Sequence, residues 1–521
     1  MLFNSLEFIF LFLPTTVAVF FLIPSLPFGN NTLAKGWLIL ASLFFYSWWN
    51  PANLPLILVS IGFNYLVSQA LSPTATHGKV RRRGILAFAI ALNLLALGYF
   101  KYYNFLIENL SALLRFDLPV RDIALPLAIS FFTFQQVAYL VESYRGTIHN
   151  RSFLSYALFV SFFPQLIAGP IVRHQDVIDQ FESPDTYRLQ ETHLAIGTFI
   201  FSVGLFKKAV FADRVAVYAS PVFEAAAQGL SLSFFEAWVG ALAYTFQLYF
   251  DFSGYTDMAI GAAYIIGIQL PINFNSPYKA TSISDFWRRW HITLSNFLRD
   301  YLYIPLGGNR RGRPRQYANL LTTMLLGGLW HGAGWTYILW GGLHGMYLVV
   351  NHFWTSLTRP LGQMRNGLLY RVASWLITFL AVVISWVFFR APNIGTALSV
   401  LGSMAGLNGI SLPRGLADKL AFLPLEDIGI RFSGLQSTLD FSITASGLWL
   451  MALMAVALLA PNSHQLVTKY GLKPPSQKVT IREPRYVSWR PTLTWAAIGS
   501  VIVLTGILHV NRVSEFLYFE F

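Results

Sequence analysis

The sequence predicts an all-α, polytopic integral membrane protein. Of its 521 residues, 55% are hydrophobic and only 12% are charged, whereas about a quarter of the residues in soluble domains are charged. Aromatic residues contribute 16% of the chain, which suits lipid-facing surfaces and the aromatic belts at membrane interfaces. Long apolar stretches recur along the whole length, so we expect roughly 11 to 14 transmembrane or re-entrant helices. Nothing indicates a separate soluble domain, and we predict one domain over residues 1–521.

The elements follow from the positions of the apolar stretches. The first has Glu7 but no Lys or Arg ahead of it and lacks a small-residue cleavage site, so we interpret it as a retained span and not as a signal peptide. The stretch 153–169 contains Pro164 and Gly169-Pro170, which would also allow a re-entrant hairpin. The candidate spans are residues 8–25, 36–50, 53–71, 84–103, 123–142, 153–169, 196–211, 232–250, 255–270, 317–333, 335–353, 372–390, 443–460 and 493–510.

Basic residues indicate the orientation of these spans. The formal net charge of +13 would suit a nucleic-acid partner in a soluble protein, but here Lys and Arg gather in short loops between apolar stretches, which is the positive-inside pattern. We therefore expect no nucleic acid, and we place the basic loops in the cytoplasm and both termini and segment 392–441 outside. The side of the linker 170–195 stays open. The cytoplasmic loops are those that contain residues 77–83, 207–214, 310–315, 359–371 and the basic loop 461–490.

The stretch Phe286–Met346 is the most informative part of the chain. It holds two histidines, His291 and His331, in apolar surroundings, with the basic loop 309–315 (NRRGRPR) between them. From the start of the apolar stretch at Tyr317, a helix rises by roughly 21 Å to reach the second histidine, against a hydrocarbon core about 30 Å thick. This histidine should therefore lie well inside the membrane, where ionisable side chains are usually functional.

Four glycines surround His331 within eight residues, at positions 327, 328, 332 and 334. They give the backbone a freedom that a regular packing helix does not need, and they favour a broken or re-entrant segment that lines a cavity. A buried histidine is more often a hydrogen-bonded packing residue, and that alternative stays open. For His291 the alternative is an interfacial position beside Arg288 and Arg289. For His344, in the next span, packing is the better interpretation.

A second polar group lies in Tyr244–Gly261 (YTFQLYFDFSGYTDMAIG). Its carboxylates, Asp251 and Asp257, sit between apolar runs, and buried carboxylates need partners. We expect this group to pair with Arg288 or Arg289 across helices, or to orient a histidine. The structural role is the better interpretation.

Other polar residues carry weaker signals. Asn296 follows His291 by five residues and is a candidate supporting residue, while Arg299-Asp300 is most simply an ion pair at the membrane surface. The chain has no cysteine and no close His, Asp and Glu cluster with ligand spacing, so we expect neither a disulfide nor a metal site. The remaining histidines lie in loops or near span ends, where a solvated or interfacial position is expected: His77, His149, His174, His193, His352, His464 and His509.

Two segments of the central stretch, RRWHITLSNFLRDYLYIPLGGNR and GGLWHGAGWTYILWGGLHG, resemble the signature of the membrane-bound O-acyltransferases, in particular the bacterial branch that acetylates exopolysaccharides such as alginate. Teichoic-acid D-alanyl transfer proteins are more distant relatives. The resemblance implies helices around a central funnel, with His331 as the catalytic histidine and His291 as a second histidine. Its core motifs lie within residues 125–346, and its further blocks are Leu125–Gly146, Phe162–His174, Gly204–Arg214, Tyr244–Gly261, Ser385–Ala391 and the ending EFLYFEF.

The resemblance also implies a reaction. Acetyl would be taken from a cytoplasmic thioester, acetyl-CoA or a similar donor, and moved across the bacterial inner membrane for O-acetylation of an exported polysaccharide. Alginate is the expected polymer, with cellulose and peptidoglycan as alternatives. One histidine would act as general base, because an imidazole with a pKa of about 6.5 can remove the proton of an attacking hydroxyl. Arg310, Arg311 and Arg313 are candidates for holding donor phosphates, although keeping the loop in the cytoplasm is the simpler role. No cofactor is expected to stay bound.

The expected partners are membrane lipid, a second protein and, indirectly, the polysaccharide. The outside segment 392–441 has no histidine and is too small to be an independent transferase. Relatives that resemble this sequence work beside separate extracytoplasmic acetyltransferases, so we expect such a partner, with Leu420–Pro424 as a possible contact. A transporter or flippase would also use a buried histidine, carboxylates and broken helices, but such transporters often show two related halves and we find no repeat.

Overall fold

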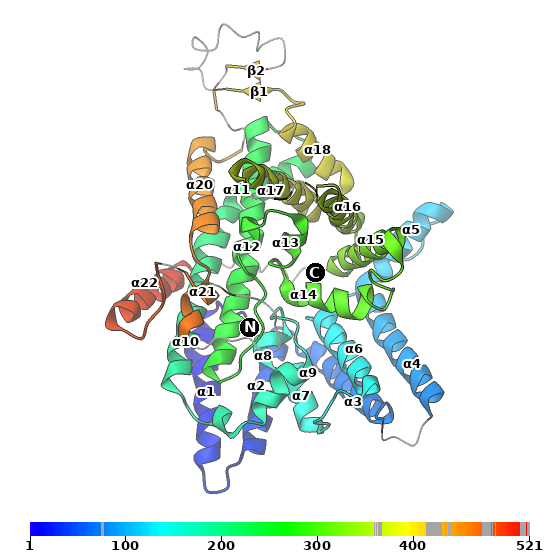
Figure 1. The fold of residues 1–521 in the computed structure, drawn as a ribbon, viewed down its shortest axis with the longest axis vertical. Coiled ribbons are helices and arrows are strands. Elements are labelled where there is room, and N and C mark those ends of the chain that lie inside the picture. The colour runs from blue at the N-terminus through cyan, green and yellow to red at the C-terminus, as the bar shows by residue number, and fades with distance from the viewer. Residues whose placement is uncertain are drawn as a thin grey trace. The chain divides into compact units, whose positions relative to one another are not determined.

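The computed structural model describes residues 1–73, 78–358, 367–412, 430–432, 439–470 and 486–510, with a few single positions besides. Over these ranges the chain is mainly helical, with almost no strand (Figure 1). The one short sheet among the described residues pairs β1 (Ile410–Ser411) with β2 (Ile430–Arg431). The prediction of an all-α fold is therefore confirmed. The stretch Leu420–Pro424, the histidine at position 77 and positions 471–480, 482 and 485 of the basic loop 461–490 lie outside the described residues.

The chain forms two compact units, each assembled from separate stretches. The first unit comprises Met1–Phe206, Ser253–Asn273 and Ser463–Phe521, and the second comprises Lys207–Phe252 and Phe274–Asn462. Because the chain passes between them more than once, neither unit is a continuous segment.

The first unit combines helices from both ends of the chain. Glycines let α10 approach the C-terminal part of α12, since a Cβ at Gly197 would lie only 2.7 Å from the carbonyl oxygen of Gly261. Its helices are η1 (Phe8–Phe12), α1 (Leu13–Leu22), α2 (Asn31–Ser47), η3 (Pro51–Asn53), α3 (Leu54–Ala70), α4 (Lys79–Leu97), η4 (Gly98–Tyr102), α5 (Tyr103–Leu114), α6 (Ile129–Arg145), α7 (Phe153–Ser161), α8 (Phe163–Leu166), α9 (His174–Phe181), α10 (Glu191–Phe206), the end of α12 (Phe234–Ile265), α21 (Ser463–Val467) and α22 (Leu493–His509).

The second unit contains the hairpin of α15 and α16, which lie side by side (Figure 1). Gly328 and Gly341 face each other where these helices cross, because a Cβ on either would lie 3.1 Å from the Cα of the other. The helices of this unit are η6 (Lys207–Ala212), α11 (Asp213–Ala227), the first part of α12, α13 (Ile283–Trp287), α14 (Ile292–Leu298), η8 (Arg299–Tyr303), α15 (Gly312–His331), α16 (Trp335–Leu357), α17 (Leu368–Arg390), α18 (Ile394–Met404) and α20 (Ile443–Leu459).

Several helices can cross a membrane. Within the described ranges five are long and apolar enough, or up to six if the bent pair Ile443–Leu459 and Ser463–Tyr470 is one span. The protein is therefore a polytopic membrane protein, as predicted. The five are Phe8–Ser25, Pro51–Ala70, Lys79–Leu114, Glu191–Ala227 and Leu368–Arg390.

Two predicted elements are wrong. The candidate spans 232–250 and 255–270 form one continuous helix, α12, of 32 residues. The predicted loop with Lys207, Lys208 and Arg214 lies inside a continuous helical stretch of 37 residues, Glu191–Ala227. In both places we took charged residues as the end of a helix. Lys208 and Asp251 instead form an ion pair inside the protein. Because each buried charge has a partner, the helices continue through both positions.

Candidate active site

His331 is the last residue of α15. The next three residues lead directly into α16, which begins at Trp335, so the predicted break falls immediately after the histidine. A Cβ at Gly332 would collide with the ring of Tyr337, which explains why glycine stands at this turn. The three-residue turn between α15 and α16 therefore follows His331 directly. The histidine is only 2% exposed.

His291 is fully buried and holds an unusual backbone conformation. It caps the N-terminus of α14 with φ 41° and ψ 54°, in the left-handed region. Such a conformation costs a residue with a side chain about 1–3 kcal/mol, and these residues cluster at functional sites. The alternative of an interfacial position does not hold, because the side chain is 0% exposed while the neighbouring Arg288 is exposed.

Aromatic rings connect the two histidines. The ring centroid of Trp330 lies 6.4 Å from that of His291 and 4.9 Å from that of His331. Phe252 packs at 4.8 Å against the first histidine and Phe389 at 5.3 Å against the second. Both imidazoles therefore lie in surroundings that exclude water.

A third histidine belongs to the same group. The ring of Trp340 lies 5.0 Å from the rings of both His331 and His344. His344 is fully buried, and neither of its ring nitrogens has a hydrogen-bond partner among the described residues. We call the continuous set His291, Trp330, His331, Trp340 and His344 the histidine–tryptophan cluster. Sequence reasoning missed Trp340, although its position four residues before His344 on one helix face was a usable signal.

Asp251 has a different partner from the one predicted. The Nζ atom of Lys208 lies 2.7 Å from Oδ1 of Asp251 and 2.8 Å from Oδ1 of Asp213. The lysine side chain is 2% exposed and the Asp251 side chain 1%. The expected pairing of Asp251 with Arg288 or Arg289 is therefore wrong. Its cation is Lys208, which lies in the helical stretch that continues into α11.

Asp257 orients a histidine, but one that sequence analysis had placed in solvent. Its Oδ1 lies 3.1 Å from Nε2 of His464, and its Oδ2 accepts a hydrogen bond of 2.7 Å from the Ser463 hydroxyl. His464 is only 3% exposed, and His174 only 2%. Both side chains were expected to be solvated or interfacial, and their burial excludes the solvated position. Burial also lowers the pKa of His174 to about 4.

The model of the membrane-bound O-acyltransferase family matches residues 84–389, a range that contains both His291 and His331. The chain belongs to this family. The acyltransferase is 48% identical over 438 residues to a peptidoglycan O-acetyltransferase of Helicobacter pylori, covering 79% of the chain and 81% of the relative. It is 43% identical over 409 residues to a probable alginate O-acetylase of Pseudomonas putida, covering 78% and 80%. It is 29% identical over 248 residues to a teichoic acid D-alanyltransferase of Streptococcus thermophilus, covering 46% and 60%.

These similarities make the chain a membrane O-acetyltransferase of this family, and they decide for an enzyme over the transporter alternative. The relatives carry the names of different acceptors, so the similarities do not choose between polymers. The cluster fits acyl transfer, since a neutral imidazole can accept a proton and a dry site protects a thioester from hydrolysis.

Further polar residues that the sequence analysis named lie on α14 or close to it in the chain. Asn296 is half-buried on α14, five residues after the cap. The expected pair of Arg299 with Asp300 is present, with 2.7 Å between Nε and Oδ1. Arg289 instead pairs with Asp285, at 3.0 Å between Nε and Oδ2.

The candidate phosphate-binding arginines of the acyltransferase, Arg310, Arg311 and Arg313, are all exposed. Because α15 already begins at Gly312, Arg313 lies in its first turn, where the guanidinium donates to the Ser356 hydroxyl at 3.1 Å. An exposed arginine can bind a donor phosphate, and it can equally keep its loop in the cytoplasm. The exposure of these three side chains therefore agrees with both roles. Across the described ranges, no group of three or more His, Asp or Glu is placed to hold a metal ion.

Proposed function

We propose that this acyltransferase takes acetyl from a cytoplasmic thioester such as acetyl-CoA and passes it across the bacterial inner membrane for O-acetylation of an exported polysaccharide. The observation that carries the proposal is the burial of His331 at the end of α15, between Trp330 and Trp340. An ionisable ring in such apolar surroundings is costly unless it has a chemical task.

The proposed reaction needs one base. The His331 imidazole accepts the proton of an acceptor hydroxyl while the hydroxyl oxygen attacks the thioester carbonyl carbon. The new C–O bond forms, the C–S bond breaks, and the leaving thiolate takes up a proton. His291, held in its left-handed conformation, positions donor or acceptor beside the shared ring of Trp330.

Substitution of His331 tests this role. We expect His331→Ala and His331→Gln to insert normally and to lose acetyl transfer, and His291→Ala to lose it in part. His352→Ala is the matched control, because this exposed histidine lies on the neighbouring helix α16. Near-normal acetylation of the polymer by either His331 variant would refute the assignment.

We propose alginate as the first candidate acceptor. The 43% identity to a probable alginate O-acetylase supports it. Peptidoglycan is the second candidate, favoured by 48% identity to a peptidoglycan O-acetyltransferase. Deletion of the gene, followed by measurement of ester-linked acetate on each isolated polymer, separates the two. The polymer that loses its acetate is the acceptor.

We further propose that a separate extracytoplasmic acetyltransferase completes the reaction. The outside segment 392–441 has no histidine to serve as a base. The purified chain given acetyl-CoA and polymer should hydrolyse the donor slowly and leave the polymer unmodified until the partner is added. Efficient acetylation by the chain alone would exclude the partner.

The proposed orientation places the arginine loop 309–315 in the cytoplasm, where Arg310, Arg311 and Arg313 can meet donor phosphates, and both termini outside. A chain without cysteines suits labelling of single cysteines in intact cells with an impermeant thiol reagent. We expect no labelling at position 312 and labelling at the C-terminus. The reverse pattern would overturn the orientation.

A further inference from the structure

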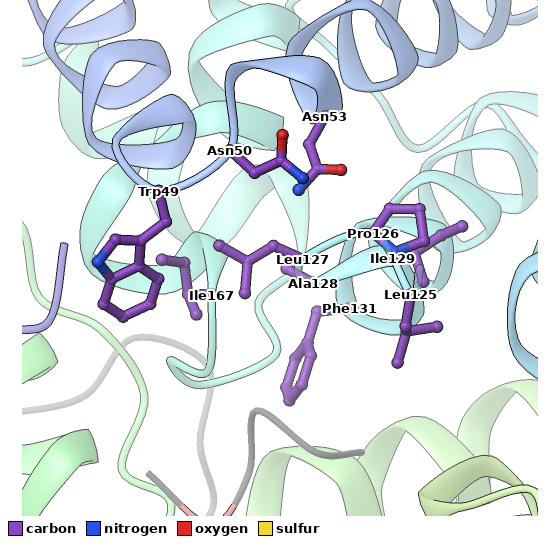
Figure 2. A pocket seen from close by; sticks show the side chains of 10 residues that line it. All are labelled: Trp49, Asn50, Asn53, Leu125, Pro126, Leu127, Ala128, Ile129, Phe131 and Ile167. Carbon is purple, nitrogen blue, oxygen red and sulfur yellow. The ribbon is translucent and has the colours of Figure 1, made fainter. Parts of the chain in front are cut away.

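Two hollows in the first unit differ in kind. The smaller has a volume of about 210 Å³ and lies between residues 49–53 and residues 125–131 (Figure 2). Its amide side chains, Asn50 and Asn53, are exposed and half-buried, so water reaches both. The larger is an apolar groove with a volume of about 850 Å³. This groove shares no residue with the histidine–tryptophan cluster, so the proposed reaction does not use it.

The turn after α1, the first part of α2 and the start of α7 form the walls of the groove. α7 packs beside α2 (Figure 1). The turn consists of η2 (Ile23–Ser25) and the four residues after it. In it the N–H of Leu26 donates to the Ile23 carbonyl at 3.2 Å, and the N–H of Gly29 donates to the Leu26 carbonyl at 2.9 Å. A Cβ at Gly29 would collide with the Ile23 carbonyl, so glycine is needed for the chain to turn back into α2.

The lining of the groove is apolar along its whole length. None of its thirteen lining residues is ionisable, and the indole N–H of Trp37 already donates to the Thr16 carbonyl at 3.0 Å. Large apolar side chains stand exposed on two walls, since Leu33 is 53% exposed, Leu40 65% and Phe153 51%. A contiguous exposed apolar surface marks a contact with an apolar partner. The occupant of the groove must therefore be apolar over most of its length.

The bilayer is the apolar neighbour of this surface. The groove begins at the end of Phe8–Ser25, which is long and apolar enough to span a membrane. In the proposed orientation the turn 23–29 follows the first span and residue 153 follows the fifth, so the walls meet at the cytoplasmic side of the membrane. Residues 30–32 (NNT), between two lining residues in the chain, are polar, uncharged and exposed. The groove therefore has an apolar length and a polar end, which match the tail and the head of a phospholipid.

Gly36 gives the groove part of its depth. It lies inside α2, where glycine stabilises a helix less than alanine does. No close helix crossing requires it, because a Cβ at this position would meet open space, in contrast to Gly328. Protein interiors are close-packed, and in a membrane both side chains and lipid tails fill such space by van der Waals contact. A side chain at position 36 would therefore occupy the space that a ligand fills.

The size of the groove and the charges near it identify the ligand. A volume of about 850 Å³ lies in the range of about 300–1,000 Å³ that encloses a small flexible ligand, and a transmembrane helix about 10 Å wide and 30 Å long is too large to enter it. Lys35, the one cation of α2, is already paired, with 2.7 Å between its Nζ and Oε1 of Glu182. We infer that the groove binds one acyl chain of a membrane phospholipid, through shape and apolar contact and without selecting the charge of the headgroup.

Photo-crosslinking of the full chain in nanodiscs tests the inference. The probe is a phosphatidylcholine with a diazirine near the end of one acyl chain, and peptide mass spectrometry locates the adducts. Adducts on the groove should exceed those on α22, where Val501 is as exposed as Leu40. Gly36→Phe should reduce the groove adducts by about fivefold, and Gly36→Leu by less, because these side chains fill the groove.

Gly62→Phe is the matched control. This glycine is half-buried like Gly36 and lies inside α3, where a Cβ also meets open space, but it does not line the groove. Its variant should give the same adducts as the wild type. A phosphatidylglycerol with the same labelled chain should give the same yield as the phosphatidylcholine, because Lys35 is already paired.

Four results would overturn the inference. Gly36→Phe and Gly36→Leu might both crosslink like the wild type, or Gly62→Phe could lose as many adducts as Gly36→Phe. Equal labelling of the groove and α22 would indicate ordinary lipid contact. Finally, a Leu40→Cys protein that forms disulfide-linked dimers in native membranes would show that a second copy covers the groove.

Discussion

Removal of the buried cation at Lys208 should destabilise the second unit strongly. Its Nζ atom lies 2.7 Å from Asp251 and 2.8 Å from Asp213, and the lysine and Asp251 side chains are at most 2% exposed. At 2.7 Å and an effective dielectric constant of about 20, one such pair attracts by about 6 kcal/mol. Desolvation offsets much of this gain, and breaking a buried pair by removing one partner typically costs about 3–5 kcal/mol.

We therefore expect Lys208→Met to lower the free energy of unfolding by about 3–5 kcal/mol. For a unit of this size that loss corresponds to a fall in apparent Tm of roughly 6–20 °C. Thermal unfolding of the purified protein in detergent, followed by tryptophan fluorescence, measures it. Lys207→Met is the matched control, because Lys207 is the neighbouring residue and is only half-buried.

The double variant decides whether the ion pair is the cause. Asp251→Asn combined with Lys208→Met removes both charges of the more deeply buried pair and leaves Asp213, whose side chain is 12% exposed. It should therefore recover part of the lost stability, with a coupling energy of at least about 2 kcal/mol. A Lys208→Met protein within about 1 kcal/mol of the wild type, or a double variant whose loss is the sum of the single losses, would refute the reasoning.

Three further predictions concern packing and pH. Gly328→Ala should loosen the α15–α16 crossing and cost about 1–3 kcal/mol, whereas Gly447→Ala, where a Cβ meets open space, should be neutral; equal thermal stabilities would contradict this. The pKa of His174 is lowered to about 4, so the unfolded chain binds a proton first as the pH falls. This histidine should lower the stability by about 3 kcal/mol between pH 6.5 and 4, and the fall in His174→Phe should be smaller by that amount; equal falls in the two proteins would contradict this. His344→Phe should keep both stability and acetyl transfer because the imidazole has no hydrogen-bond partner among the described residues; lost transfer would give His344 a chemical role.

The local features of the site could be predicted from the sequence. Glycines on both sides of His331 predicted a break in the helix, and α15 ends at that histidine. The burial of this residue, which is 2% exposed, agrees with its apolar surroundings in the sequence, whereas its depth in the membrane stays a prediction. Local spacing sufficed here because a helix end and its burial depend on neighbouring residues.

The partners of the buried carboxylates could not be predicted. Asp251 pairs with Lys208, which lies 43 positions earlier and counted as a loop residue because it is charged. His464 was expected to be solvated or interfacial because it lies near the end of a span, yet it lies against Asp257, about 200 positions earlier. A charge surrounded by apolar residues carries no information on its partner, since pairing depends on contacts distant in the sequence.

Two changes to the candidate spans, one at 153–169 and one at α12, would cancel in their effect on the proposed orientation. α7 and α8 have nine and four residues, a combined rise of roughly 20 Å, which is too short to cross a core of about 30 Å. If α12 is a span, its continuity makes it one crossing where two were predicted. Each change would then remove one crossing, so the side proposed for the loop 309–315 would be unchanged.

The sides of the segments between these two places are affected, however. In this arrangement the linker 170–195, whose side the sequence left open, would lie in the cytoplasm, and the turn 228–233 after α11 would lie outside. A cysteine in place of Leu230, which is 54% exposed, distinguishes the two arrangements. It should be labelled from outside in intact cells if the helix lengths set the topology. The cysteine should be protected if the candidate spans of the sequence analysis and their positive-inside orientation are right. Protection would mean that α12 crosses the membrane twice or that α7 and α8 cross it.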